Sequence, residues 1–153
     1  MVSDLELRIL RKLQADGRMT NAALAEAVNL SAASCHRYKQ KLLQDGLISS
    51  IRAHVRPEAV HLSTLVMVGV VLDQSTQESL SEFEKAICCN ELKGVLDCYL
   101  VSGEYDYILK IRVRDIEAFN RLHANHLIRL PRVSQLRTFF VLKAVRDNEL
   151  LPF

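Results

Sequence analysis

Signals for export, membrane insertion and the common kinds of active site are missing from this sequence of 153 residues. No apolar run is long enough to cross a bilayer, and the first residues, MVSDLELRIL, are acidic early and lack the plan of a signal peptide. We therefore expect a cytoplasmic protein with no membrane partner. Apolar residues make up 49% and charged residues 25% of the chain, which fits a soluble globular protein of one medium or two small domains.

Motifs of catalytic and metal sites are missing as well. No C-x-x-C pair occurs among the four cysteines, Cys35, Cys88, Cys89 and Cys98. In a chain without an export signal, we expect these residues to be reduced, partly buried thiols. His123 and His126 lie three positions apart, but no third ligand is evident near them, so packing explains them better than a metal site. With no Gly-rich phosphate loop and no Ser/His/Asp set, the sequence predicts no cofactor, no metal and no enzyme.

Positive charge is in excess only in the first part of the chain. Residues 1–60 contain nine Lys or Arg and six Asp or Glu, whereas residues 61–153 contain eleven and twelve. This excess is modest, so tight binding of a polyanion would need two or more copies of the first part.

Three helices are expected in this basic part: Ser3–Ala15, Asn21–Val28 and Ala32–Gln44. Ser3 and Glu6 have capping-box spacing at the start of the first helix. Ser31 can cap the third helix, and Gly46 follows its end, where a left-handed residue is common. The last two helices are separated by the tight turn Asn29–Leu30, which indicates a helix-turn-helix unit.

The third of these helices has an apolar side and a polar side. Cys35, Tyr38 and Leu42 lie together on a helical wheel, opposite small and polar residues. Such a helix can enter the major groove of DNA, where Arg and Gln hydrogen bond to base edges and Lys contacts phosphates. An ordinary helical hairpin with a solvated charged side is the simpler alternative. The predicted DNA-binding residues are Ser31, Ala33, Ser34, His36, Arg37, Lys39, Gln40 and Lys41.

A strand or short hairpin is expected directly after the third helix. Leu47–Val55 (LISSIRAHV) has the composition of a strand, and a strand in this place is what a winged helix-turn-helix contains. Arg56–Glu58 breaks the pattern. We therefore predict a winged helix-turn-helix domain over residues 1–56, a linker over 57–63 and a second domain over 64–153.

The second domain alternates strands and helices in the order βαββαβ, which predicts an α+β, ferredoxin-like fold. The expected strands are Leu65–Leu72, Val95–Val101, Tyr105–Val113 and Leu136–Leu142, and the expected helices are Gln77–Ile87 and Ile116–Ile128. Right-handed crossovers place both helices on one face of a four-stranded antiparallel sheet. In the third strand, the odd positions from Tyr107 to Val113 are apolar and should face inward.

The other face of this sheet would be left bare. The first strand is apolar at every position from Leu65 to Leu72, and Phe139 and Phe140 must point in opposite directions. Exposing apolar area to water is unfavourable by about 25 cal/mol per Å². A second copy of the same sheet is the simplest cover, so we expect a homodimer through this domain.

The turn between the second and third strands is the best candidate for a small-molecule site. Ser102 and Gly103 offer backbone N–H groups to a carboxylate, and Asp106 offers an acceptor to an ammonium group, so together they could hold an amino acid. An ordinary hairpin turn is the alternative. A catalytic acid/base pair drawn from Asp97, Glu104 and Asp106 is disfavoured because no nucleophile accompanies them.

Two groups of residues combine into a family pattern. The first domain carries Ile9-Leu10, Asp16-Gly17-Arg18, Leu30-Ser31 and Gly46-x-Ile48, and the second carries Leu100–Tyr107 (LVSGEYDY), Leu130-Pro131-x-Val133 and the Thr138–Lys143 strand. In this order they resemble the leucine-responsive/asparagine-response (Lrp/AsnC, feast/famine) family over almost the whole chain. The Gly-x-x-Asp segment beginning at Gly103 is the most specific part of the resemblance.

The resemblance implies a bacterial or archaeal transcription regulator. In that family the first domain binds double-stranded DNA, and the second, an ACT-like or RAM domain, forms homodimers that commonly assemble into octamers. A small amino acid acts as effector and binds between dimers. Carried over by position, the effector site comprises Val101, Ser102, Gly103, Glu104, Tyr105, Asp106, Ile116, Thr138, Phe139 and Phe140.

The main hypothesis is therefore an amino-acid-responsive, sequence-specific DNA-binding regulator. His36, Arg37 and Gln40 would read bases, while Lys39 and Lys41 would contact phosphates. The alternative is a metabolite-sensing module that regulates a protein partner and uses its helical domain only as an adaptor.

Overall fold

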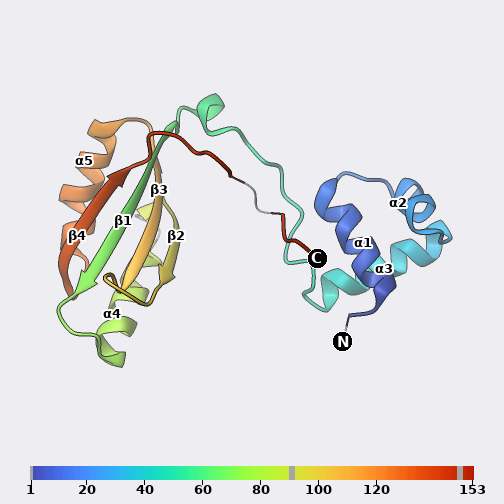
Figure 1. Cartoon of the computed structure of the whole chain (residues 1–153), viewed down its shortest axis with the longest axis horizontal. Helices are drawn as coiled ribbons and strands as arrows, with labels where there is room; N and C mark the ends of the chain where they lie inside the picture. Colours follow the sequence, from blue (N-terminus) through green and yellow to red (C-terminus); the bar gives the residue numbers. More distant parts are fainter. Residues whose placement is uncertain (1, 90–91, 148–149) are drawn as a thin grey trace. The chain divides into compact units, whose positions relative to one another are not determined.

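The computed structural model describes residues 2–89, 92–147 and 150–153 of the chain. These residues form two compact units, which are described separately (Figure 1). The first contains residues 1–54 together with 146–153, and the second contains residues 55–145. The predicted linker, residues 57–63, includes the short 3-10 helix η1 (Pro57–Val60).

The first unit is built on three helices, α1 (Asp4–Ala15), α2 (Asn21–Val28) and α3 (Ala32–Gln44). A hydroxyl caps each of them, because Ser3, Thr20 and Ser31 all accept a bond from a backbone N–H in the first turn. The capping box of α1 is complete, since the Ser3 backbone N–H donates to Glu6 Oε2 at 2.8 Å. The predicted helices are therefore confirmed almost to the residue.

The backbone conformation of two residues sets the turns around α3. Asn29, between α2 and α3, is left-handed with φ of 57°, and Gly46, after α3, has φ of 73°. Beyond Gly46, the Ile48 N–H donates to the Leu42 carbonyl at 3.0 Å, which closes the end of the helix. The core that holds the three helices together consists of Ile9, Leu13, Leu24, Ala25, Val28, Cys35 and Leu42.

The prediction of a strand or short hairpin at Leu47–Val55 is wrong. Within the described residues, this segment is irregular and pairs with no strand. A strand is stable only when a neighbour takes up its N–H and C=O groups, and the first unit supplies none here. Instead the segment packs through side chains, because a Cβ placed on Gly17 would lie 3.1 Å from Ile51 Cγ2.

The second unit is a four-stranded antiparallel sheet in the order β2-β3-β1-β4. Its strands are β1 (Thr64–Leu72), β2 (Val95–Leu100), β3 (Tyr107–Val113) and β4 (Val133–Phe140). Helices α4 (Gln77–Ile87) and α5 (Ile116–Asn125) and the short η3 (Leu127–Arg129) complete the unit. The predicted βαββαβ fold is confirmed.

Several element boundaries differ from those expected. The helix predicted to reach Ile128 ends at Asn125, and η3 follows it. The last strand begins at Val133, three residues before the expected Leu136, because β4 pairs with β1 as far as Leu72. The third strand begins only at Tyr107, since the two residues before it belong to the turn.

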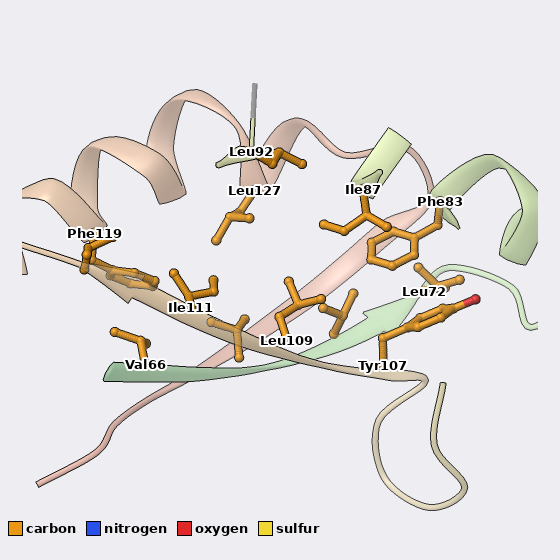
Figure 2. Packing of buried hydrophobic residues seen from close by; sticks show 13 residues of the cluster. Val66, Leu72, Phe83, Ile87, Leu92, Tyr107, Leu109, Ile111, Phe119 and Leu127 are labelled. Carbon is orange, nitrogen blue, oxygen red and sulfur yellow. The ribbon is translucent and has the colours of Figure 1, made fainter. Parts of the chain in front are cut away.

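Both helices cover one face of the sheet. Phe83 and Ile87 of α4, Phe119 of α5 and Leu127 of η3 point towards the inward side chains of the strands (Figure 2). Tyr107, Leu109, Ile111 and Val113 of β3 are buried as predicted. The inward residues of β1 are Val66, Val68, Val70 and Leu72.

The opposite face of the sheet carries no helix among the described residues. Leu65 and Met67 of β1 lie on this face and are half-buried, and Phe139 of β4, paired with Met67, is 50% exposed. Phe140 points the other way, since its ring meets that of Phe119 at 5.3 Å. The expectation that the two phenylalanines diverge is confirmed, and the sheet presents an apolar open face.

Candidate functional sites

Helix α3 presents its polar side outward. Cys35 and Leu42 are fully buried, which fixes the rotation of the helix. Of the predicted DNA-binding residues, Ser34 and Lys39 are half-buried, and the exposed ones are Ser31, Ala33, His36, Arg37, Gln40 and Lys41. The structure therefore brings the base-reading candidates together on one accessible surface.

Neighbouring side chains order this surface. The Asn21 side-chain amide nitrogen lies 3.0 Å from His36 Nδ1, within hydrogen-bond distance. The Arg37 guanidinium lies over the Tyr38 ring, 6.0 Å from its centroid. Both contacts reduce the entropy that these side chains would lose on binding.

Lys41 is engaged within the first unit. Its ammonium group lies 3.0 Å from Glu6 Oε1, so it links α3 to the start of α1. The pKa of Glu6 falls from 4.5 to about 2, first because the Ser3 backbone N–H donates to the carboxylate and then because Lys41 does. The same ion pair raises the pKa of Lys41. A phosphate contact by Lys41 would have to share or replace this ion pair.

The turn after β2 has the conformation expected of an exposed loop. Ser102, Gly103 and Glu104 are all exposed, and Gly103 has φ of 130°, a conformation that favours glycine. The Val101 N–H donates to the Asp106 carbonyl at 2.9 Å and closes the turn. A Cβ placed on Gly103 would meet no heavy atom within 4 Å, so its backbone is open to a ligand.

Asp106 ties this turn to the end of β1. Its Oδ2 accepts from the Leu72 N–H at 2.7 Å, and its Oδ1 accepts from the Ser75 hydroxyl at 2.9 Å. The Asp106 N–H in turn donates to the Val70 carbonyl at 2.9 Å. Both carboxylate oxygens thus already have donors within the chain, a structural role that the sequence pattern does not reveal.

The predicted effector residues fall into two groups. Tyr105 lies over Gly69 of β1, and its ring meets Phe139 edge-on at 6.4 Å, so these residues belong to the turn and the open face. Thr138 and Phe140 pair with Val68 and Val66, whose side chains face the helices. Exposed Ile116 opens α5. A single chain therefore does not gather the ten predicted residues around one point.

Tyr107 is a supporting residue that sequence reasoning did not assign. Its hydroxyl donates to Glu84 Oε1 of α4 at 2.8 Å, and its ring lies 4.5 Å from that of Phe83. Burial, followed by the bond to Glu84, raises the pKa of Tyr107 well above its usual value. A tyrosine at an inward strand position needs a polar partner, and that signal was available in the sequence.

The cysteines and histidines show no sign of a metal site. Cys35 is buried, Cys88 and Cys89 are exposed, and burial raises the pKa of the half-buried Cys98 to about 11. Across the described residues, no group of three His, Cys, Asp or Glu side chains could hold a metal ion. In the same part of the chain, no helix is long and apolar enough to cross a membrane.

Known proteins match both units. The family model of a winged helix-turn-helix DNA-binding domain matches residues 2–49, and that of the Lrp/AsnC ligand binding domain matches residues 65–151. The leucine-responsive regulatory protein of Klebsiella pneumoniae is 34% identical over 147 residues, which are 96% of this chain and 88% of that protein. The protein of the same name from Escherichia coli K12 matches with the same identity and coverage.

Solved structures agree with the sequence matches. A transcriptional regulator from Neisseria meningitidis in complex with L-methionine superposes with a TM-score of 0.90 at 28% identity, covering 99% of this chain and 97% of that one. An AsnC family regulator from Agrobacterium tumefaciens gives 0.89 at 29% identity, with 98% and 96% covered. Such proteins are regulators rather than enzymes. The chain belongs to the Lrp/AsnC family of DNA-binding transcription regulators, with a winged helix-turn-helix domain followed by a ligand-binding domain.

Proposed function

We propose that the protein is a cytoplasmic regulator that reads a specific DNA sequence with α3 and responds to a small amino acid. The observation that carries the first half is the polar side of α3, where His36, Arg37 and Gln40 are exposed while Cys35 and Leu42 fix the helix from behind. Arg and Gln at such positions can form paired bonds to base edges in the major groove. We assign half-buried Lys39 to a phosphate contact. Lys41 would contact a phosphate as well, with its ammonium group shared between that phosphate and Glu6.

The proposed active form is a homodimer built on the open face of the sheet. Leu65, Met67 and Phe139 give this face an apolar centre that water covers poorly. A two-fold dimer places two copies of α3 on one duplex, so the operator should be an approximate palindrome with half-sites about one helical turn apart. The family resemblance implies that such dimers assemble further into an octamer.

The proposed effector site lies at the turn Val101–Asp106. The exposure of Ser102 and Gly103 supports it, since backbone N–H groups in an exposed turn can take a carboxylate. The related Neisseria meningitidis regulator was solved with L-methionine, an amino acid. Because the ten predicted residues separate in one chain, we assign Thr138, Phe140 and Ile116 to the edges of a site completed by another copy.

Arg37→Ala tests the reading surface. Operator sequences are selected from random DNA with the full chain, and affinity is then measured by fluorescence anisotropy across a salt series. We expect the selected site to bind at least about a thousandfold tighter than random DNA, and the variant to lose about 1–3 kcal/mol of that preference. Lys12→Ala, at an exposed residue of α1, is the matched control and should leave the preference for the selected site intact. Equal affinity of the Arg37 variant at every sequence would refute the assignment.

A thermal-shift screen of the twenty amino acids tests the effector. A ligand that binds only the folded protein raises the melting temperature in proportion to the logarithm of its concentration above Kd. At millimolar concentration we expect at least one amino acid to stabilise the wild type, and Gly103→Val to abolish the effect. Absence of stabilisation by all twenty would remove the sensing role while leaving DNA binding untouched.

A further inference from the structure

The last residues of the chain pack on α1 of the first unit. Arg11 Nε donates to the Phe153 carbonyl at 2.6 Å, and its guanidinium lies over the Phe153 ring, 5.9 Å from the centroid. Arg11 therefore holds one residue by its backbone and its side chain together.

Gln14, one turn further along α1, holds Leu151 by its backbone. The Gln14 Nε2 donates to the Leu151 carbonyl at 2.9 Å, and the Leu151 N–H donates to Gln14 Oε1 at 3.2 Å. A side-chain amide that pairs with both the N–H and the C=O of one residue imitates a neighbouring β-strand. This is the way a groove recognises an extended segment of chain.

The surface beneath this segment is apolar and concave. Leu10 and Leu13 of α1, with Gly17 and the irregular residues Leu47 and Ile51, line a hollow of about 860 Å³, and Leu151 and Phe153 form part of its wall. Phe153 is only 40% exposed there, although the sequence around it is irregular. Apolar walls with two polar side chains aimed at the backbone are the usual composition of a peptide-binding site.

We propose that the surface formed by α1 around Arg11 and Gln14 is a docking site whose occupant is the chain's own segment Leu150–Phe153. Docking closes a loop of chain, because the helical unit is then joined to the sheet unit both through residues 55–63 and through residues 141–149. A unit held at two points samples fewer orientations than a unit on one flexible linker. The consequence for DNA, which rests on the proposed function, is that docking fixes how the reading helices are spaced.

Tryptophan fluorescence can test the docking directly, since the chain contains no tryptophan. In the full-length Phe153→Trp variant, the single indole should emit at shorter wavelength than free tryptophanamide. Because Phe153 is partly covered, acrylamide should quench the indole with a smaller rate constant than it does free tryptophanamide. Adding Arg11→Ala and Gln14→Ala in the same chain should restore the free value.

Lys12→Ala in the Phe153→Trp background is the matched control. Lys12 is an exposed long cation on the same helix, and its removal should leave quenching unchanged. Circular dichroism checks that every variant keeps its helices. Free quenching in the Phe153→Trp chain itself would overturn the proposal. Protection that disappears on dilution to the monomer would assign the segment to a second copy and would equally overturn docking within one chain.

A DNA measurement tests the consequence separately. On selected sites whose half-sites are moved apart by about half a helical turn, the wild type should lose most of its affinity. For each protein, the loss of affinity is the ratio of Kd on the respaced site to Kd on the original site. This ratio should be less than half as large for the Arg11→Ala, Gln14→Ala variant as for the wild type. An unchanged ratio would overturn the spacing role. If no DNA binds at all, the proposed function fails, while the fluorescence result still decides the docking.

Discussion

At the scale of single residues, polar side chains fix backbone positions that apolar packing alone leaves open. Asp106 receives the Leu72 N–H and the Ser75 hydroxyl, and Glu6 receives the Ser3 N–H and Lys41. In both cases a carboxylate joins segments far apart in sequence. Sequence reasoning identified the capping role of Glu6 from its spacing, but it treated Lys41 and Asp106 as free for ligands, because their partners lie beyond local spacing.

Glu6 should make the free energy of unfolding depend on pH in the acidic range. Its folded-state pKa of about 2 is below the ordinary 4.5, so its contribution is complete above about pH 4.5 and is lost as the pH falls towards 2. Glu6→Gln should therefore lower the free energy of unfolding at pH 7, and the difference from wild type should shrink between pH 4.5 and 2. Urea denaturation at several pH values measures this.

Glu26→Gln, an exposed glutamate of α2, is the control for that series. It should change the free energy of unfolding little at any pH. A Glu6→Gln effect that stays constant from pH 7 to pH 2 would contradict the role assigned to the ionised carboxylate.

At the scale of elements, helices and strands could be predicted from capping residues and from the periodicity of apolar residues. The capping residues Ser3 and Ser31 indicated the starts of α1 and α3, and alternation indicated the inward side of β3. The segment Leu47–Val55 shows the limit of this reasoning. Its composition favours a strand, but a strand also needs a partner, and partners are set by tertiary structure.

Position 69 in β1 accepts only glycine as long as the Tyr105 ring lies over it, which the composition of the strand does not show. A Cβ there would lie 2.6 Å from Tyr105 Cδ1, so Gly69→Ala should force the ring away and lower the free energy of unfolding by about 1–3 kcal/mol. In a Tyr105→Ala background the same substitution should cost almost nothing. Urea unfolding of the four proteins in this double-mutant cycle measures the coupling, and additive effects would show that the ring yields freely.

At the scale of the whole molecule, the sequence predicted both domain folds and the family, because each domain carries its own periodic pattern and the motifs recur in order. It did not predict that Arg146–Phe153 packs with the helical unit. Contacts of short irregular segments leave no periodic trace, so only the structure reveals them. The ten residues predicted for the effector site separate within one chain, so the composition of that site stays a prediction.

Dimer formation through the open face has a direct test. Phe139→Asp should weaken self-association at least about thirtyfold, the equivalent of about 2 kcal/mol, because it places a charge at the centre of the proposed interface. Ile128→Asp, at an apolar residue of η3 with a similar exposed fraction, is the matched control. Sedimentation equilibrium measures both, and equal dissociation constants would place the interface elsewhere.

The position of Tyr105 has a further consequence. This aromatic ring rests on a stretch of β1 without a side chain and touches Phe139 at its edge, yet it is covalently part of the turn that starts at Val101. Any molecule that displaces that turn must therefore also reshape the outer surface of the sheet. If the proposed effector site and the proposed dimer interface are both correct, Tyr105 is the residue that couples effector binding to the fit between protomers.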